Sequence, residues 1–309
     1  MLELTSKDLT VRFSALGAKL VSVVVDGVDV VVGPGSDADA LAHDSYTGTV
    51  TGRHAGRITK ARYELDGNAI KLVANVDDDQ LHGGPQNFCN SVWRPSNVEN
   101  GIAFTLHSPD GDQGFPGDMD VTATYRLAGP VLSLDFQATT SKPTVINLTN
   151  HAYWNLAGTS AKAGSGLDQE VEMPADHFLP LHGPKLPTGE IRHVEGTAYD
   201  FRKLRKVGQA YDTCFCLTGQ RGTLRKGLTL RDPGSGRVME VFTDDTSIQF
   251  YTADHFGPTM PGKYGPLAQH NSIAIEPQNY PDAPNHANFP SSILRPGEIY
   301  RHRIEWRFS

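Results

Sequence analysis

Hydrophobic and polar positions alternate along most of the chain with the two-residue period of β-strands. Two valine-rich segments, residues 21–25 and 28–32, are separated by Asp26-Gly27. Asp-Gly tolerates the positive φ angles of a two-residue turn, so these segments predict a β-hairpin. A second hairpin of the same kind is predicted at residues 62–65 and 69–72. Further strands are predicted at residues 102–106, 121–127, 131–136, 228–230, 237–242, 247–252 and 300–308.

Long stretches rich in Gly, Pro and Asp separate these strands, and loops of this length usually carry function or are ordered by packing. Helical periodicity is nowhere sustained over a dozen residues, and no linker or short repeat divides the chain. The pattern therefore predicts an all-β fold, with residues 1–309 forming a single large antiparallel domain with little helix. Its long loops are expected at residues 33–39, 108–119, 174–195 and 257–266.

Composition excludes several classes of partner. The chain carries 28 Lys and Arg against 35 Asp and Glu, a net charge of −7, and it contains no basic block. Nucleic acid and anionic membranes are therefore not expected as partners. The first residues lack a basic region followed by an apolar run, so no signal peptide is predicted. No stretch approaches the ~18 apolar residues of a membrane span.

Three cysteines, Cys89, Cys214 and Cys216, are a sparse and odd set that fits a reduced, cytoplasmic location. The Cys-x-Cys pair lacks a second pair that would complete a four-ligand metal site. Buried structural thiols are therefore expected rather than a metal centre.

Two residues suggest acid–base chemistry. Glu276 stands in an apolar, proline-stiffened segment, where desolvation would raise its pKa from ~4.3 toward neutrality. Such a glutamate is a candidate general base, although a salt-bridged strand residue would give the same pattern. His151 lies in a comparable setting within residues 147–156, where asparagines could instead satisfy a core histidine. The pair suggests proton transfer on a polyhydroxylated ligand.

Four segments, taken in order, resemble the aldose 1-epimerase (galactose mutarotase) family. They are GRHAGRI at residues 52–58, LHGG at 81–84, NHAYWNL at 150–156 and EPQNYPDA at 276–283. Each alone is a weak signal, but the ordered set is specific, and the resemblance runs from about residue 46 to the end. It implies the two-sheet β-sandwich ("supersandwich") of that family. It also implies interconversion of the α and β anomers of free aldohexoses such as galactose or glucose.

The implied reaction constrains the site. A proton leaves the anomeric hydroxyl while another reaches the ring oxygen, the aldehyde rotates, and the ring closes from the other face. This requires no redox step, phosphate, cofactor or metal. A base and an acid must instead reach two oxygens on one carbon of a small ligand. The expected partner is a monosaccharide, and both a monomer and a homodimer stay open.

The resemblance also implies individual roles. Glu276 would be the base at the anomeric hydroxyl, and His151 the acid at the ring oxygen. His151 should then start protonated, with its pKa raised above ~6.5 by the nearby carboxylate. His82 would be a second histidine near the ring oxygen, acting as a donor or supporting acid. Sugar-binding positions would be occupied by Arg57, Asp212 and Gln249.

Two departures from the family pattern concern binding rather than catalysis. The position before Arg57 is often Asn in this family and is Gly56 here, so one side-chain hydrogen bond to the sugar is missing or replaced by water. The usual Asp-His-Asn-Phe run is Asp212-Thr213-Cys214-Phe215, which keeps the carboxylate but changes its loop. Both departures affect substrate preference more than the type of reaction.

Three other functions remain open. A sugar-binding or sugar-sensing protein could keep the fold without catalysis, although binding alone does not need a matched acid and base. His82, His151 and Glu276 could form a two-histidine, one-carboxylate metal site. A relative acting on phosphorylated sugars would need additional cations, which residues 60–62 or 202–206 could supply by folding inward.

Overall fold

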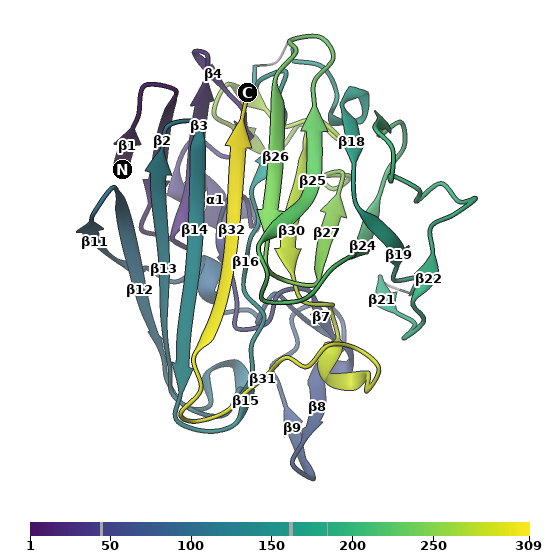
Figure 1. Cartoon of the computed structure of the whole chain (residues 1–309). Coiled ribbons are helices and arrows are strands. Elements are labelled where there is room, and N and C mark those ends of the chain that lie inside the picture. The colour runs from purple at the N-terminus through teal and green to yellow at the C-terminus, as the bar shows by residue number, and fades with distance from the viewer. Residues whose placement is uncertain (44–45, 161–162, 184) are drawn as a thin grey trace.

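The computed structural model describes residues 1–43, 46–160, 163–183 and 185–309. Two large antiparallel sheets lie one behind the other (Figure 1). The long strands β12 to β14 and β32 dominate the larger sheet. In sheet order it contains β11 (Arg94–Val98), β12 (Gly101–Ser108), β13 (Met119–Ala128), β14 (Val131–Thr140), β32 (Tyr300–Phe308), β26 (Val238–Thr243), β25 (Arg225–Arg231), β18 (Glu170–Glu172) and β23 (Arg205–Lys206).

The smaller of the two large sheets carries several residues of the candidate site described below. In sheet order it contains β22 (Arg192–His193), β19 (Ala175–Phe178), β24 (Asp212–Leu217), β27 (Ser247–Tyr251), β30 (Ile273–Gln278), β17 (Tyr153–Trp154) and β5 (Val31–Val32). A separate N-terminal sheet contains β1 (Leu2–Thr5), β2 (Leu9–Ser14), β3 (Lys19–Val25) and β4 (Val28–Asp29).

The hydrophobic core fills the space between the sheets. Alternate side chains of each strand point inward, so Phe136 and Ile304 from the larger sheet join Phe250 and Ile275 from the smaller one in a single buried cluster. Each such side chain contributes roughly 1.5–3 kcal/mol by leaving water. The two sheets therefore form the predicted β-sandwich.

The predicted hairpins are present. Strand β3 pairs with β4 across Asp26-Gly27, but the second valine segment breaks at Val30 into β4 and β5, which join different sheets. The second hairpin consists of β8 (Arg62–Leu65) and β9 (Asn68–Lys71). Strands β13 and β14 also pair as expected.

Some predicted loops contain regular structure. The loop expected at 33–39 leads into a helix, α1 (Asp37–His43), whose first turn is capped by Ser36, which accepts from the backbone N–H of Asp39. The helix is too short for its periodicity to appear in the sequence. The loop expected at 174–195 contains four short strands, β19, β20 (Leu181–His182), β21 (Leu186–Pro187) and β22. The loop expected at 257–266 contains two, β28 (Pro261–Gly262) and β29 (Gly265–Pro266).

Short ladders connect the loops around the smaller sheet. They pair β6 (Val50–Thr51) with β16 (Thr149–Asn150), β7 (Arg57–Ile58) with β10 (Gln80–Leu81), and β15 (Thr144–Val145) with β31 (Ile293–Leu294). The 3₁₀ helices are η1 (Thr59–Ala61), η2 (Phe88–Asn90), η3 (Asp112–Gly114), η4 (Gly166–Asp168) and η5 (Ala283–Asn285). These ladders bring segments distant in sequence to one end of the sheet.

The three cysteines are buried and form no disulfide bond, as their small and odd number predicted. Among the described residues, no helix is both long enough and apolar enough to cross a membrane.

Candidate active site

Strand register determines which side chains the smaller sheet presents to a cavity of about 260 Å³. Gln249 on β27 lies opposite Glu276 on β30, and Asp212 on β24 lies opposite Tyr251 on β27. Paired residues stand on the same face of a sheet, as do residues two apart such as Gln249 and Tyr251. Asp212, Gln249 and Glu276 therefore share the cavity face.

Another wall of the cavity comes from the ladder between β7 and β10, where Arg57 pairs with Leu81. His82 follows β10 with a φ of 53°. The backbone N–H of Gly56 donates to Nδ1 of His82 at 3.2 Å. Because Nδ1 accepts this bond, the neutral ring carries its proton on Nε2 and can donate it to a ligand.

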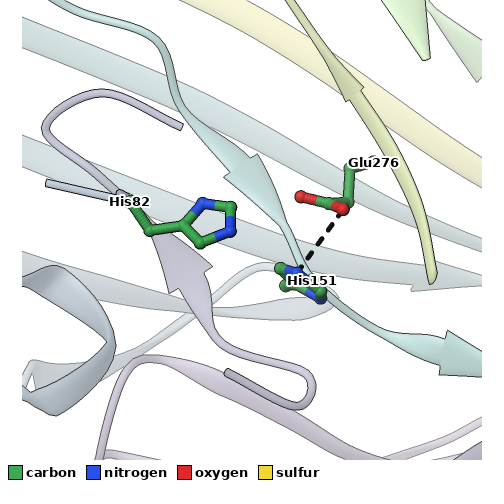
Figure 2. A group of neighbouring side chains, drawn as sticks. All are labelled: His82, His151 and Glu276. Atoms are coloured by element: carbon green, nitrogen blue, oxygen red, sulfur yellow. Dashed lines mark ion pairs between the residues drawn. The ribbon is translucent and has the colours of Figure 1, made fainter. Parts of the chain in front are cut away.

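His151 reaches the cavity from the segment between β16 and β17. Its backbone N–H donates to the carbonyl of Thr49 at 2.9 Å, and its own carbonyl accepts from Gly48 at 2.9 Å. Its Nε2 lies 3.5 Å from Oε1 of Glu276, with side-chain exposures of only 5% and 2%. Figure 2 shows His82, His151 and Glu276 gathered from three separate segments of the chain.

Hydrogen bonds tie the segment that carries His151 to the strand that carries Glu276. The hydroxyl of Thr149 donates to the carbonyl of Pro277 at 2.8 Å. The backbone N–H of Asn279 donates to Oδ1 of Asn147 at 2.9 Å, and Nδ2 of Asn147 donates back to the carbonyl of Asn279 at 3.2 Å. These asparagine bonds hold the two segments in one register, which keeps the imidazole and the carboxyl adjacent.

Burial shifts the proton equilibria of this pair. Desolvation raises the pKa of Glu276 well above its usual 4.5, and the negative charge of Asp212 raises it further. Oε2 of Glu276 has no hydrogen-bond partner among the described residues, so little else stabilises the carboxylate. Glu276 is therefore a carboxyl of elevated basicity, as its sequence environment predicted.

The protonation expected for His151 is wrong. Burial lowers its pKa from 6.5 to about 3, because the imidazolium would lose its hydration. A neighbouring carboxylate favours the imidazolium only while the carboxylate is charged, and burial disfavours that charge as well. When the pair holds one proton, the proton lies on Glu276 rather than on His151.

His82 is also neutral. Desolvation lowers its pKa well below 6.5, and the positive charge of Arg57 lowers it further. This agrees with the hydrogen bond from Gly56 to Nδ1, which requires a lone pair on that nitrogen. His82 is thus able to donate a hydrogen bond from Nε2 but is not a strong acid.

A polar network flanks the acid–base pair. Nε2 of Gln249 donates to Oδ1 of Asp212 at 2.6 Å. Lys185 Nζ lies 2.8 Å from Oδ2 of Asp212 and 3.8 Å from Oδ1 of Asp254. Asp212 is thereby held in one orientation, with its charge balanced by a lysine that the sequence analysis did not identify.

Arg57 lines the same cavity but lacks a carboxylate partner. Within the described ranges its Nε is buried without a hydrogen bond, and no ion pair engages its guanidinium. A guanidinium offers five N–H donors in a planar fork. Arg57 therefore presents unused donors to oxygen atoms of a ligand.

The structure brings all six predicted residues to one cavity, namely Arg57, His82, His151, Asp212, Gln249 and Glu276. Sequence reasoning missed Lys185 and Gln278, which also line it. Gln278 had a signal, because it stands two positions after Glu276 on a strand and so shares its face. Lys185 had none, since it lies in a loop whose path depends on tertiary packing.

The alternative of a metal site has a geometric basis. His82, His151 and Glu276 place candidate ligand atoms within 4.8 Å of one another. However, Nδ1 of His82 already accepts from Gly56, and Nε2 then carries the proton. His82 thus has no lone pair to offer without breaking that bond, and the arrangement favours hydrogen bonding over metal ligation.

Comparison with known proteins identifies the family. The aldose 1-epimerase family model matches residues 1–307. The chain belongs to the aldose 1-epimerase family. A galactose mutarotase from Bos taurus is 40% identical over 290 residues, covering 91% of this chain and 84% of the relative. An aldose 1-epimerase from Escherichia coli is 31% identical, covering 85% of this chain and 80% of the relative.

Solved structures of aldose 1-epimerase relatives share the fold. An aldose epimerase homologue from C. elegans superposes with a TM-score of 0.92 at 28% identity, covering 100% of this chain and 98% of its own. A galactose 1-epimerase from Lactobacillus acidophilus superposes with a TM-score of 0.87 at 26% identity, covering 99% and 93%. The predicted family and fold are both confirmed.

Proposed function

We propose that this chain is an isomerase that interconverts the α and β anomers of free aldohexoses such as galactose or glucose, without a cofactor. The observation that carries the proposal is the 3.5 Å approach of Nε2 of His151 to Oε1 of Glu276 within one cavity. The volume of this cavity, about 260 Å³, is slightly below the ~300–1,000 Å³ typical of small-molecule sites and suits a single sugar ring.

In this mechanism the single proton of the pair moves from Glu276 to His151 when a sugar binds. Glu276 then takes the proton of the anomeric hydroxyl, and His151 gives its proton to the ring oxygen. The bond between C1 and the ring oxygen breaks, the aldehyde rotates about its bond to C2, and the ring closes on the other face. Sugar oxygens that hydrogen-bond to the charged forms offset the desolvation that favours a neutral pair. Proton transfer at each site contributes about 10²–10⁴-fold.

Binding roles follow from the polar groups of the cavity. The guanidinium of Arg57, whose Nε has no hydrogen bond to any described residue, and the carboxylate of Asp212 would hold sugar hydroxyls. Gln249 would orient Asp212. Neutral His82 would donate from Nε2 near the ring oxygen. These groups position the anomeric carbon between His151 and Glu276.

Polarimetry on freshly dissolved α-galactose and α-glucose tests the proposal. The protein should accelerate mutarotation over buffer, and Glu276→Gln should reduce turnover by at least ~10²-fold while weak sugar binding persists. No acceleration across a panel of aldoses would identify a sugar-binding protein instead. Near-normal turnover of the glutamine variant would remove Glu276 from its role.

A phosphorylated substrate would need positive charge beyond that of Arg57, which the proposal assigns to sugar hydroxyls. Residues 60–62 and 202–206 do not line the cavity, and the charge of Lys185 is balanced by Asp212 and Asp254. Free sugars are therefore the proposed substrates. Competition between a free sugar and its 6-phosphate checks this choice.

Three further properties complete the proposal. Residues 1–309 are proposed to act as one domain, as a monomer or a homodimer. A cytoplasmic location is supported by three buried, unlinked thiols.

A further inference from the structure

Gln278 shares the cavity face with the proposed base. Side chains alternate along a strand, so Glu276 and Gln278 on β30 point to the same side while Pro277 points to the other. Gln278 lines the cavity and is fully buried, with 0% of its surface exposed to solvent. It therefore stands beside the reacting groups.

The amide of Gln278 is unusual in having no partner. Neither Nε2 nor Oε1 is hydrogen-bonded to any residue that the structure describes. Leaving a buried polar group unpaired costs about 1–3 kcal/mol. Neighbouring side-chain amides have partners: that of Asn147 bonds to the backbone of Asn279, that of Asn279 donates to the carbonyl of Pro290, and that of Gln249 donates to Asp212. The unpaired amide thus marks an interaction that the protein alone does not supply.

Gly56 adjoins this amide without a side chain. Its φ of +77° favours glycine, and a Cβ there would lie 2.7 Å from Cβ of Pro281. The same Cβ would lie 3.6 Å from Nε2 of Gln278. Because a side chain at this position would be strained, residue 56 places no atoms of its own between the cavity and the amide.

We propose that Gln278 is a further substrate-binding residue, whose carboxamide hydrogen-bonds one hydroxyl of the sugar and so contributes to sugar selection. The inference rests on the proposed function only in taking the ligand to be a monosaccharide. An amide offers both a donor and an acceptor, which matches a hydroxyl group. Gln249 does not fill this role equally, since its Nε2 is engaged with Asp212.

The test replaces the amide by an apolar side chain of similar size. Gln278→Leu should raise KM and the calorimetric Kd about tenfold, equivalent to about 1.4 kcal/mol, and change kcat less than threefold. Gln278→Met provides a second variant if the leucine protein folds poorly. An unchanged Kd in a folded variant would overturn the inference.

Monodeoxy sugars identify the hydroxyl concerned. Each deoxygalactose is titrated against the natural protein and Gln278→Leu, and the coupling between the two changes is calculated. One deoxy sugar should bind the natural protein weakly and lose no further affinity in the variant. Equal penalties in both proteins for every deoxy sugar would mean that Gln278 touches no hydroxyl.

Gln169→Leu serves as the matched control. Gln169 is also fully buried, and its Nε2 lacks a partner among the described residues, but it does not line the cavity. This variant should lose stability while keeping its Kd for sugar. If the natural protein binds sugars without accelerating mutarotation, the proposed catalysis fails, yet the titrations still decide the role of Gln278.

Discussion

At the scale of single residues, burial determines where the proton of the proposed catalytic pair, Glu276 and His151, lies. Desolvation penalises the charged form of each group, so it raises the pKa of Glu276 and lowers that of His151 to about 3. The sequence predicted that the adjacent carboxylate would raise the pKa of His151, but in this site burial outweighs that effect. The pair titrates as a unit, and its working form holds one proton.

This arrangement predicts the pH dependence of kcat/KM for the free protein. The acid limb should appear when the pair takes a second proton, near the pKa of His151, which is about 3. The basic limb should appear when the pair loses its only proton, at the raised pKa of Glu276. Initial rates measured by polarimetry across the pH range check this assignment. An acid limb at the ordinary glutamate pKa of about 4.5 would contradict it.

Arg53 and Arg57, four positions apart in the chain, differ in role. Arg57→Ala should raise KM at least about tenfold with little change in Tm, because a hydrogen bond to a charged group contributes about 1.5–3 kcal/mol. Arg53 is the control, since it is 2% exposed and donates to Ser108, Pro109 and Gly117. Arg53→Ala should instead lower Tm, and a purely stability-related effect of Arg57→Ala would make Arg57 structural.

At the scale of elements, a buried histidine links the strand of the base to the other sheet. Nδ1 of His302, on β32, lies 2.8 Å from Oδ1 of Asp244. Its Nε2 lies 3.1 Å from the carbonyl oxygen of Pro277 on β30. Both partners accept, so both ring nitrogens must donate and the ring is an imidazolium. Burial alone would lower its pKa, but Asp244, Asp245 and the carbonyl together raise it above 6.5.

The raised pKa of His302 gives stability a defined pH dependence. The contribution should be fully present below the unfolded pKa of ~6.5 and lost as pH rises through the folded value. Denaturant unfolding of the natural protein and His302→Gln should therefore give a stability difference that shrinks as pH rises from 6 to 9. His107→Gln, at an exposed position, is the control. A difference independent of pH would show that His302 is not charged in the folded protein.

At the scale of the whole molecule, the site depends on contacts between distant parts of the sequence. His82, His151 and Glu276 come from three segments that converge on one cavity (Figure 2). Their approach needs the stacked sheets and the short ladders between β6 and β16 and between β7 and β10. A two-residue strand is too short to show an alternating pattern in the sequence. Several strands within the long loops were therefore not predicted.

Local chemistry was sufficient to predict some features. Asp26-Gly27 determines a turn because few other dipeptides tolerate its backbone angles, and alternation in residues 121–136 determines which side chains face the core. The isolated carboxylate of Glu276 indicated a perturbed pKa, and the ordered motifs indicated the family. These properties depend on a few neighbouring residues.

Tertiary structure alone decided the rest. The pKa of His151 depends on how completely other segments exclude water from it, and Lys185 reaches Asp212 only through the path of its loop. Whether the amide of Gln278 has a partner depends on which side chains the fold places around it, and none of the described residues supplies one. Turn and strand preferences are local free energies, whereas desolvation and pairing depend on which distant atoms fill the space around a group.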